Sequence, residues 1–176
     1  MSEIANDSGM SAANLYRYFD NKQEIVVECA SRAMNDRLDR LREITDRGEL
    51  SAGAKLKLYA RELVEDNHDL IGDDSMVGEL VDNITRERPQ VVHDKNEIHY
   101  DLLSQILAEG NANGEFSVSD CNQCARHIHS AMMLFDVPLF VGFYSRAEFM
   151  SRADGVIDLL LNGLRKHSEP PSAASE

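Results

Sequence analysis

A short segment near the start of the chain carries side chains whose chemistry suits contact with a nucleic acid. Asn14 can pair bidentately with adenine and Arg17 with guanine in a major groove. The small side chains of Ala12 and Ala13 allow close approach to base edges and can meet a thymine methyl group. We expect the base-contacting face to comprise Ser11, Ala12, Ala13, Asn14, Tyr16 and Arg17.

The same segment carries groups that suit phosphate. Lys22 falls in the first turn of an expected helix, where the helix dipole disfavours a cation. Its position makes sense if a phosphate docks there, because free backbone N–H groups and the ammonium would hold it jointly. The hydroxyl groups of Tyr16 and Tyr18 are further phosphate donors.

Two short helices must position these side chains. The first is expected over residues 2–8 and ends at Gly9, because glycine readily adopts the left-handed conformation that terminates helices. The second is capped by Ser11 and is expected to continue through Phe19. Together they form a helix-turn-helix. Its small shared core is expected to comprise Ile4, Ala5, Met10, Leu15 and Phe19.

Residues 9–25 resemble the DNA-binding signature of TetR-family regulators, through the run Gly-Met-Ser-x-x-x-Leu-Tyr-Arg-Tyr-Phe-x-Asn-Lys-x-Glu-Ile. The resemblance covers about residues 3–28. It implies that the base-contacting face defined above reads DNA, and that the two tyrosines and Lys22 grip phosphates. It also implies a long linking helix, a ligand pocket among the middle helices and a final helix pair that dimerises.

The start of the chain departs from this family pattern. The family places a full helix before the helix-turn-helix pair, whereas Met1 falls inside what should be the second helix. We therefore expect a partial DNA-binding domain at residues 1–28, in a chain that begins at an internal Met. The alternative is a dimeric helical small-molecule-binding protein that does not bind DNA, because the first helix is absent.

The rest of the sequence predicts an all-α fold, in which a helical ligand-binding and dimerisation bundle follows the head. Asn21 and Glu24 resemble a capping box that opens a linking helix over about 21–46. The bundle is expected over 47–166, and a disordered tail over 167–176. Its helices are expected to begin near Ser51, Met76, Pro89, Ser119 and Arg146, with a polar loop at 67–74.

Two groups of residues in the bundle predict contacts with other molecules. Flexible Met side chains suit an adaptable apolar pocket for an unidentified small-molecule effector. The pocket residues are expected to be Met76, Leu80, His99, Leu103 and Phe135. The last two helices carry wide apolar faces that a four-helix seam between two copies would cover. The seam is expected to comprise Cys124, Ile128, Met132, Phe149, Val156, Leu160 and Leu164.

Cysteines and histidines at residues 121–129 follow a spacing that suggests metal binding. On one helix, however, Cys121, Cys124, His127 and His129 fan out over a wide arc and cannot converge alone on a tetrahedral ion. His93 and Glu97 could share a metal, but an exposed pair explains them better. We therefore expect no metal, no cofactor and no catalytic residue. The rival reading is a small helical metalloenzyme built on His93, His99 and the 121–129 run.

The charge distribution separates the head from the body. The formal net charge is −13, and a polyanion repels an acidic protein unless the contact surface is less negative. Residues 1–22 contain two basic and three acidic groups, a net charge of −1; the remainder contains 16 and 28, a net charge of −12. The net negative charge therefore lies almost wholly outside the head.

The whole chain predicts a cytoplasmic, homodimeric, ligand-responsive transcription regulator of the repressor type. It would bind double-stranded DNA at a near-palindromic operator. Three cysteines without a secretory signal indicate reduced thiols in the cytoplasm. No apolar run approaches the ~20 residues that a membrane helix needs, so no membrane contact is expected.

Overall fold

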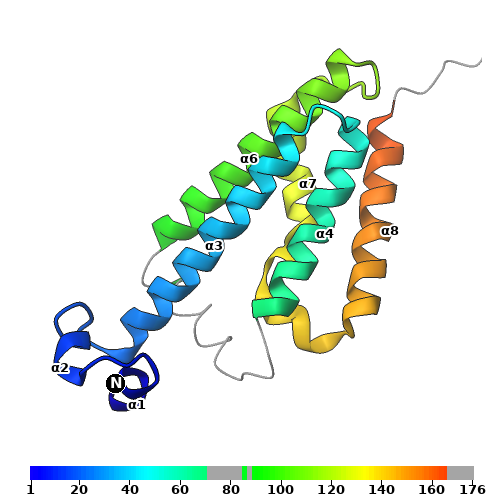
Figure 1. The fold of residues 1–176 in the computed structure, drawn as a ribbon. Helices are drawn as coiled ribbons and strands as arrows, with labels where there is room; N and C mark the ends of the chain where they lie inside the picture. Colours follow the sequence, from blue (N-terminus) through cyan, green and yellow to red (C-terminus); the bar gives the residue numbers. More distant parts are fainter. Residues whose placement is uncertain (71–84, 87–88, 166–176) are drawn as a thin grey trace, which may run out of the picture.

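The structure is a computed structural model that describes residues 1–70, 85–86 and 89–165. All the regular elements in this part are helices, which confirms the predicted all-α fold (Figure 1). They are α1 (Ser2–Asp7), α2 (Ala12–Leu15), α3 (Lys22–Asp46), α4 (Ala52–Leu70), α6 (Pro89–Ala112), α7 (Cys121–Asp136), the 3-10 helix η1 (Pro138–Phe143) and α8 (Arg146–Leu164). No helix within these ranges is both long and apolar enough to cross a membrane.

The head consists of α1, a tight turn and α2. Gly9 lies in the turn with a φ of 67°, in the left-handed region where glycine avoids a steric penalty. The hydroxyl of Ser11 accepts a hydrogen bond from the Asn14 backbone N–H at 3.2 Å, as expected of a helix cap. Regular helix ends at Leu15 rather than Phe19, because bonds of three-residue spacing tighten the next turn.

The core of the head is smaller than the sequence predicts. Ala5 and Leu15 are buried, and they come from α1 and α2 respectively. Ile4 and Phe19 are half-buried. Met10 is exposed, so its predicted place in this core is wrong.

Helix α3 runs from the head into the body (Figure 1). Asn21 caps it by accepting from the Glu24 backbone N–H at 3.0 Å, while the Glu24 carboxylate accepts from the Asp20 N–H at 2.8 Å. The reciprocal bond therefore falls one residue earlier than in a standard capping box. The second half of α3 buries Leu38 and Leu41, so this half is anchored in the body.

The body packs α3, α4, α6, α7 and α8 around one apolar core, with α4 in contact with each of the others. Helix α4 continues to Leu70, whereas a loop was predicted from Asn67. Asn67 is buried and hydrogen bonded inside the body, so its polarity does not end the helix. The cap of α7 is Asp120 rather than Ser119, because the Asp120 carboxylate accepts from the Gln123 N–H at 2.9 Å. The predicted helix at 76–84 and the tail at 167–176 lie outside the described residues.

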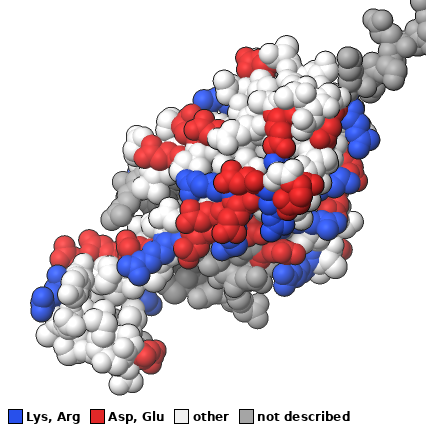
Figure 2. All heavy atoms as spheres, turned by 45° about the horizontal axis from the view of Figure 1, so that its top comes forward, with Lys and Arg blue, Asp and Glu red and all other residues white. Residues whose placement is uncertain are grey.

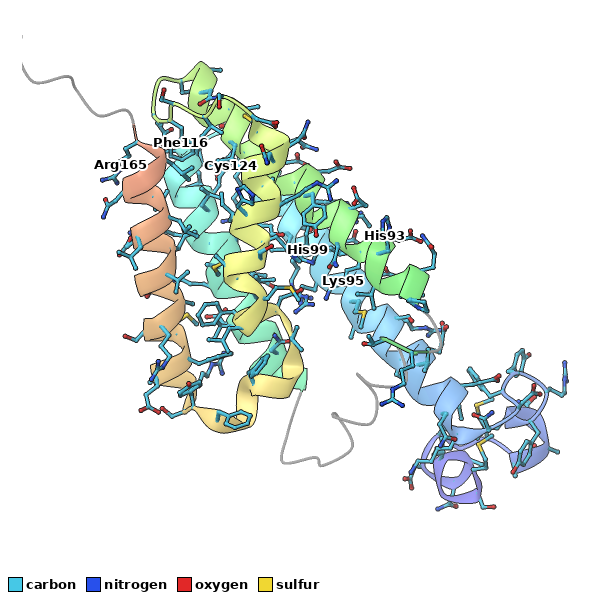
Figure 3. The ribbon with its side chains drawn as sticks, turned by 180° about the vertical axis from the view of Figure 1, so that it is seen from behind. His93, Lys95, His99, Phe116, Cys124 and Arg165 are labelled. Carbon is cyan, nitrogen blue, oxygen red and sulfur yellow. The ribbon has the colours of Figure 1, made fainter. Side chains whose placement is uncertain are left out.

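The connection from α6 to α7 closes one end of the body. Phe116 folds back onto Gly110, and its ring occupies the space that a Cβ atom at residue 110 would fill. The same connection pairs Phe116 with Arg165 at the end of α8 (Figure 3). The Glu115 carboxylate also accepts from the first N–H groups of α4, at Ala52 (3.0 Å) and Gly53 (3.1 Å). This connection therefore links the N-terminus of α4 and the end of α8 to the turn between α6 and α7.

Candidate DNA-contacting head and buried polar cluster

The predicted DNA-contacting residues lie on α2, its flanks and the first position of α3. Tyr16 and Tyr18 are 55 % and 64 % exposed, and Arg17 and Lys22 are also exposed. The remaining predicted residues are divided between exposed Ser11 and Ala13 and half-buried Ala12 and Asn14. The long polar side chains of this set are thus accessible in the single chain.

The surface charge of the body differs from that of the head. On the face shown in Figure 2, acidic groups crowd the body and are interleaved with basic ones, whereas the head is mostly uncharged. The Arg17 guanidinium lies 5.6 Å from the centre of the Tyr18 ring, which is within the range of a weak cation–π contact. A weakly charged head allows a polyanion to approach despite the acidic body.

A second candidate site is a buried polar cluster centred on Asp136, the last residue of α7. Its carboxylate Oδ1 lies 2.9 Å from Nη2 of Arg37 on α3 and 3.3 Å from Nζ of Lys95 on α6. Arg37 and Asp136 are both almost fully buried. Buried charges normally require such pairing, because desolvation is otherwise prohibitive.

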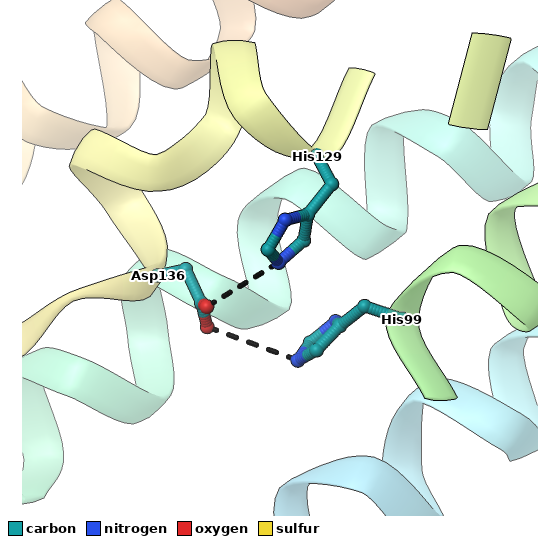
Figure 4. A group of neighbouring side chains, drawn as sticks. All are labelled: His99, His129 and Asp136. Atoms are coloured by element: carbon teal, nitrogen blue, oxygen red, sulfur yellow. Dashed lines mark ion pairs between the residues drawn. The ribbon is translucent and has the colours of Figure 1, made fainter. Parts of the chain in front are cut away.

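Two histidines face the same carboxylate (Figure 4). Nε2 of His129 lies 3.6 Å from Oδ2 of Asp136, and Nε2 of His99 lies 3.9 Å from Oδ1. The two rings are 5.0 Å apart between centres, and both histidines are buried. Neither Nε2 atom has a hydrogen-bond partner among the described residues.

Helix α4 also contributes two side chains to the cluster. The hydroxyl of Tyr59 is hydrogen bonded to Nδ1 of His99. The side chain of Asn67 accepts from Nη1 of Arg37 at 3.3 Å and donates to the backbone carbonyl of Phe135. The cluster therefore ties together α3, α4, α6 and α7.

Burial and charge set the protonation of these groups. Burial lowers the pKa of His99 to about 3, although Asp136 acts in the opposite direction, so the imidazole is neutral at neutral pH. Burial would raise the pKa of Asp136, but Lys95, His129 and Arg37 together hold it well below its usual range. Burial and the Asp136 charge raise the pKa of Tyr59 well above its usual range. The cluster thus holds a carboxylate, two cations and a neutral His99.

Comparison with known families shows what kind of protein this is. A family model described as "Tetracyclin repressor-like, C-terminal domain" matches residues 52–157, and one described as "Bacterial regulatory proteins, tetR family" matches residues 1–29. The chain belongs to the TetR family. It is a DNA-binding transcriptional regulator, as the sequence predicts.

Individual relatives agree with this assignment. The regulator is 25 % identical over 168 residues to the "Fatty acid metabolism regulator protein" of Bacillus subtilis (strain 168), covering 93 % of this chain and 84 % of that protein. A transcriptional regulator from Cytophaga hutchinsonii has the same fold, with a TM-score of 0.78, 20 % identity and coverage of 94 % and 88 %. FadR from Bacillus subtilis, solved in complex with stearoyl-CoA, gives a TM-score of 0.62, 20 % identity and coverage of 93 % and 88 %.

The residues predicted to line a ligand pocket fall into two groups. His99, Leu103 and Phe135 are buried inside the body of the regulator, on α6 and α7. Met76 and Leu80 lie outside the described residues. The three described side chains share the interior between helices, where a pocket was expected, and their role in ligand binding stays a prediction.

The residues predicted for a dimer seam also divide. Ile128, Met132 and Phe149 are fully buried in the core of the single chain, which corrects their prediction as contacts to a second copy. The Phe149 ring, for example, packs against that of Phe135 with 5.1 Å between centres. The other members are half-buried and stay a prediction: Cys124, Val156, Leu160 and Leu164. Sequence reasoning passed over Leu159, which is 73 % exposed on α8.

Sequence reasoning also missed the polar cluster as a unit. Asp136 is not singled out by the sequence, yet this residue lies seven residues after His129. That spacing places two side chains on nearly the same helix face two turns apart. The seven-residue spacing could therefore have predicted that His129 and Asp136 lie close together on α7. Nothing in the local sequence pairs them with Arg37 or His99, which come from other helices.

Proposed function

We propose that the regulator is a homodimeric, effector-responsive repressor whose α2 segment enters the major groove. The exposure of Tyr16, Arg17, Tyr18 and Lys22 on the projecting head carries this proposal (Figure 1). Two heads related by a two-fold axis would read a near-palindromic operator with half-sites about one helical turn apart. Such a protein acts where the chromosome lies, in the cytoplasm.

Each head residue has a separate proposed role. Arg17 and Asn14 contact base edges, with Ser11, Ala12 and Ala13 allowing the close approach that these contacts need. Lys22, Tyr16 and Tyr18 contact phosphates on either side and fix the position of the head. The exposure of the long side chains and the small size of the others support this division.

We place the dimer seam on the outer faces of α7 and α8. The exposed side chain of Leu159 supports this, together with half-buried Val156, Leu160 and Leu164 on the same helix and Cys124 on α7. Apolar side chains exposed along one helix favour association with a matching face. A second copy supplies such a face by symmetry.

We propose a long-chain acyl-CoA as the effector class. The Bacillus subtilis relative is named for fatty acid metabolism, and FadR was solved in complex with stearoyl-CoA. An acyl chain suits the apolar interior near Leu103 and Phe135, and the residues expected to share this pocket are His99, Met76 and Leu80. Arg37 of α3 meets α6 and α7 at Asp136, so a ligand that shifts these helices would also shift the helix that carries the head.

DNA binding is tested by a gel-shift titration against an operator recovered by selection from random duplexes. Arg17→Ala and Lys22→Ala should each weaken binding at least tenfold. Arg47→Ala is the matched control, because Arg47 is exposed at the far end of α3. Equal affinity of all four proteins would refute the assigned head surface.

The effector class is tested on the same complex. Stearoyl-CoA should release the operator, whereas coenzyme A alone should not. Release by coenzyme A as well, or by neither compound, would reject an acyl-CoA effector while leaving the DNA-binding assignment standing.

A further inference from the structure

Three buried side chains of the polar cluster have possible metal-ligand atoms that lie close to one another. One ring nitrogen of His99, one of His129 and a carboxylate oxygen of Asp136 all lie within 4.8 Å of one another, and Nε2 of each histidine faces the carboxylate (Figure 4). We propose that these three residues form a binding site for a divalent transition metal ion of the zinc class. Two imidazoles and a carboxylate are among the ligand sets that zinc takes in proteins, and a fourth position stays open to a small ligand.

The distances are close to those of a coordination sphere. Ligand atoms placed at roughly 2.0–2.2 Å from a tetrahedral ion lie about 3.3–3.6 Å from one another. The two histidine-to-carboxylate separations are 3.6 Å and 3.9 Å. These two separations end on different oxygens of the Asp136 carboxylate, and the three ligand atoms span at most 4.8 Å. Small rotations of the imidazoles and the carboxylate would therefore be needed to bring all three ligand atoms onto one ion.

The two imidazoles are already oriented for metal binding. Their Nε2 atoms are buried, face Asp136 and have no hydrogen-bond partner among the described residues, although buried polar atoms are normally satisfied. Tyr59 binds the other nitrogen of His99, which orients the ring in the way that outer groups orient metal-ligating histidines.

The two cations of the cluster set the strength of this site. Arg37 and Lys95 both approach Oδ1 of Asp136, whereas Oδ2 faces His129. An arriving ion must therefore compete with them for the carboxylate. The side chain of Lys95 is 14 % exposed and can swing outward, whereas Arg37 is 3 % exposed and also bound to Asn67. Metal binding should thus displace Lys95, and removal of its charge should tighten binding.

This site differs from the cysteine and histidine run on α7. Cys121 and Cys124 are half-buried free thiols, and His127 is exposed. His93 is exposed on the outer side of α6 (Figure 3). These groups are the natural places for incidental zinc binding, so they supply the controls.

The test is a calorimetric titration of the chelator-treated full chain with Zn²⁺, without DNA or effector. We expect one ion per chain, and at least a tenfold loss of affinity in His99→Gln and in His129→Gln. His93→Gln and a Cys121→Ser/Cys124→Ser double variant should match the parent chain. Lys95→Gln should bind more tightly than the parent, a gain that a misfolded variant would not give.

Co²⁺ supplies an independent readout of the ligands. Bound to the parent chain, it should show visible d–d bands of a nitrogen and oxygen site, without a sulfur-to-cobalt charge-transfer band. A thiolate band, loss of zinc binding in the cysteine double variant, or no binding by the parent chain would overturn the proposal. Such a result would leave the proposed repressor function untouched, because neither DNA nor acyl-CoA enters the measurement.

Discussion

The guanidinium of Arg37 lies 2.9 Å from the carboxylate of Asp136, and both side chains are almost fully buried. Arg37 belongs to α3, the helix that carries the head, whereas Asp136 is the last residue of α7 in the body. This ion pair therefore joins the connecting helix to the bundle at a point where bulk solvent does not screen it.

Removal of Arg37 should strongly destabilise the fold. Arg37→Met leaves a buried carboxylate with fewer partners, and breaking a buried pair costs about 3–5 kcal/mol. We expect the lower end of this range, because Lys95 still lies 3.3 Å from the carboxylate. The measurement is the free energy of unfolding in urea.

A matched control for this change lies on the same helix. Arg42 forms a 2.6 Å pair with Asp39, but both side chains are largely exposed. Arg42→Met should change the free energy of unfolding by less than about 1 kcal/mol. Similar losses in the two variants would contradict a special role for the buried pair.

The two kinds of head contact should differ in salt dependence and specificity. Lys22→Gln removes a proposed phosphate contact, so it should weaken binding to all duplexes and reduce the salt slope by about 1. Arg17→Gln removes a proposed base contact, so it should cost about 1–3 kcal/mol on the operator and relax the preference at one base pair. Affinity measured against salt concentration, on the operator and on single-base variants, separates the two. Identical behaviour of the two variants would reject the division of roles.

Gly110 should not tolerate a methyl group. A Cβ atom there would lie 2.1 Å from the Phe116 ring, and overpacking a core costs about 1–3 kcal/mol. Gly155 on α8 is the control, since a Cβ atom there meets nothing within 4 Å. Gly155→Ala should instead stabilise by about 0.5–1 kcal/mol, because glycine in a helix interior is unfavourable relative to alanine. Thermal unfolding of both variants should show a lower melting temperature for Gly110→Ala and a higher one for Gly155→Ala.

Local signals in the sequence predicted the local features of the fold well. Gly9, Ser11 and Asn21 each act within a few residues of their own position, so turn and cap chemistry identifies them. The prediction of a loop from Asn67 was wrong, because a polar residue suggested a loop where α4 in fact continues. Arg37 and the Phe135 carbonyl, the partners of Asn67, lie 30 and 68 residues away, and only tertiary packing brings them together.

The limits of the site prediction have the same physical origin. Periodicity showed that Phe149 lies on an apolar face, but it does not show which neighbour covers that face. In the structure the neighbour is the chain's own core. Likewise, the sequence singled out His99 but not Asp136, because their contact depends on how α6 packs against α7.

The proposed dimer seam predicts that a charge at Leu159 separates the two copies. Leu159 and Phe143 are each 73 % exposed, but Leu159 is on α8 within the proposed seam, whereas Phe143 ends η1 outside it. Leu159→Glu places a carboxylate in a surface that must become dry on association, and an unpaired buried charge is costly. We expect this variant to sediment as a monomer in analytical ultracentrifugation, while Phe143→Glu sediments as a dimer like the parent chain. Because two half-sites bind two linked heads, the monomer should also lose most of its operator affinity. A dimeric Leu159→Glu variant would show that the seam lies elsewhere on the body.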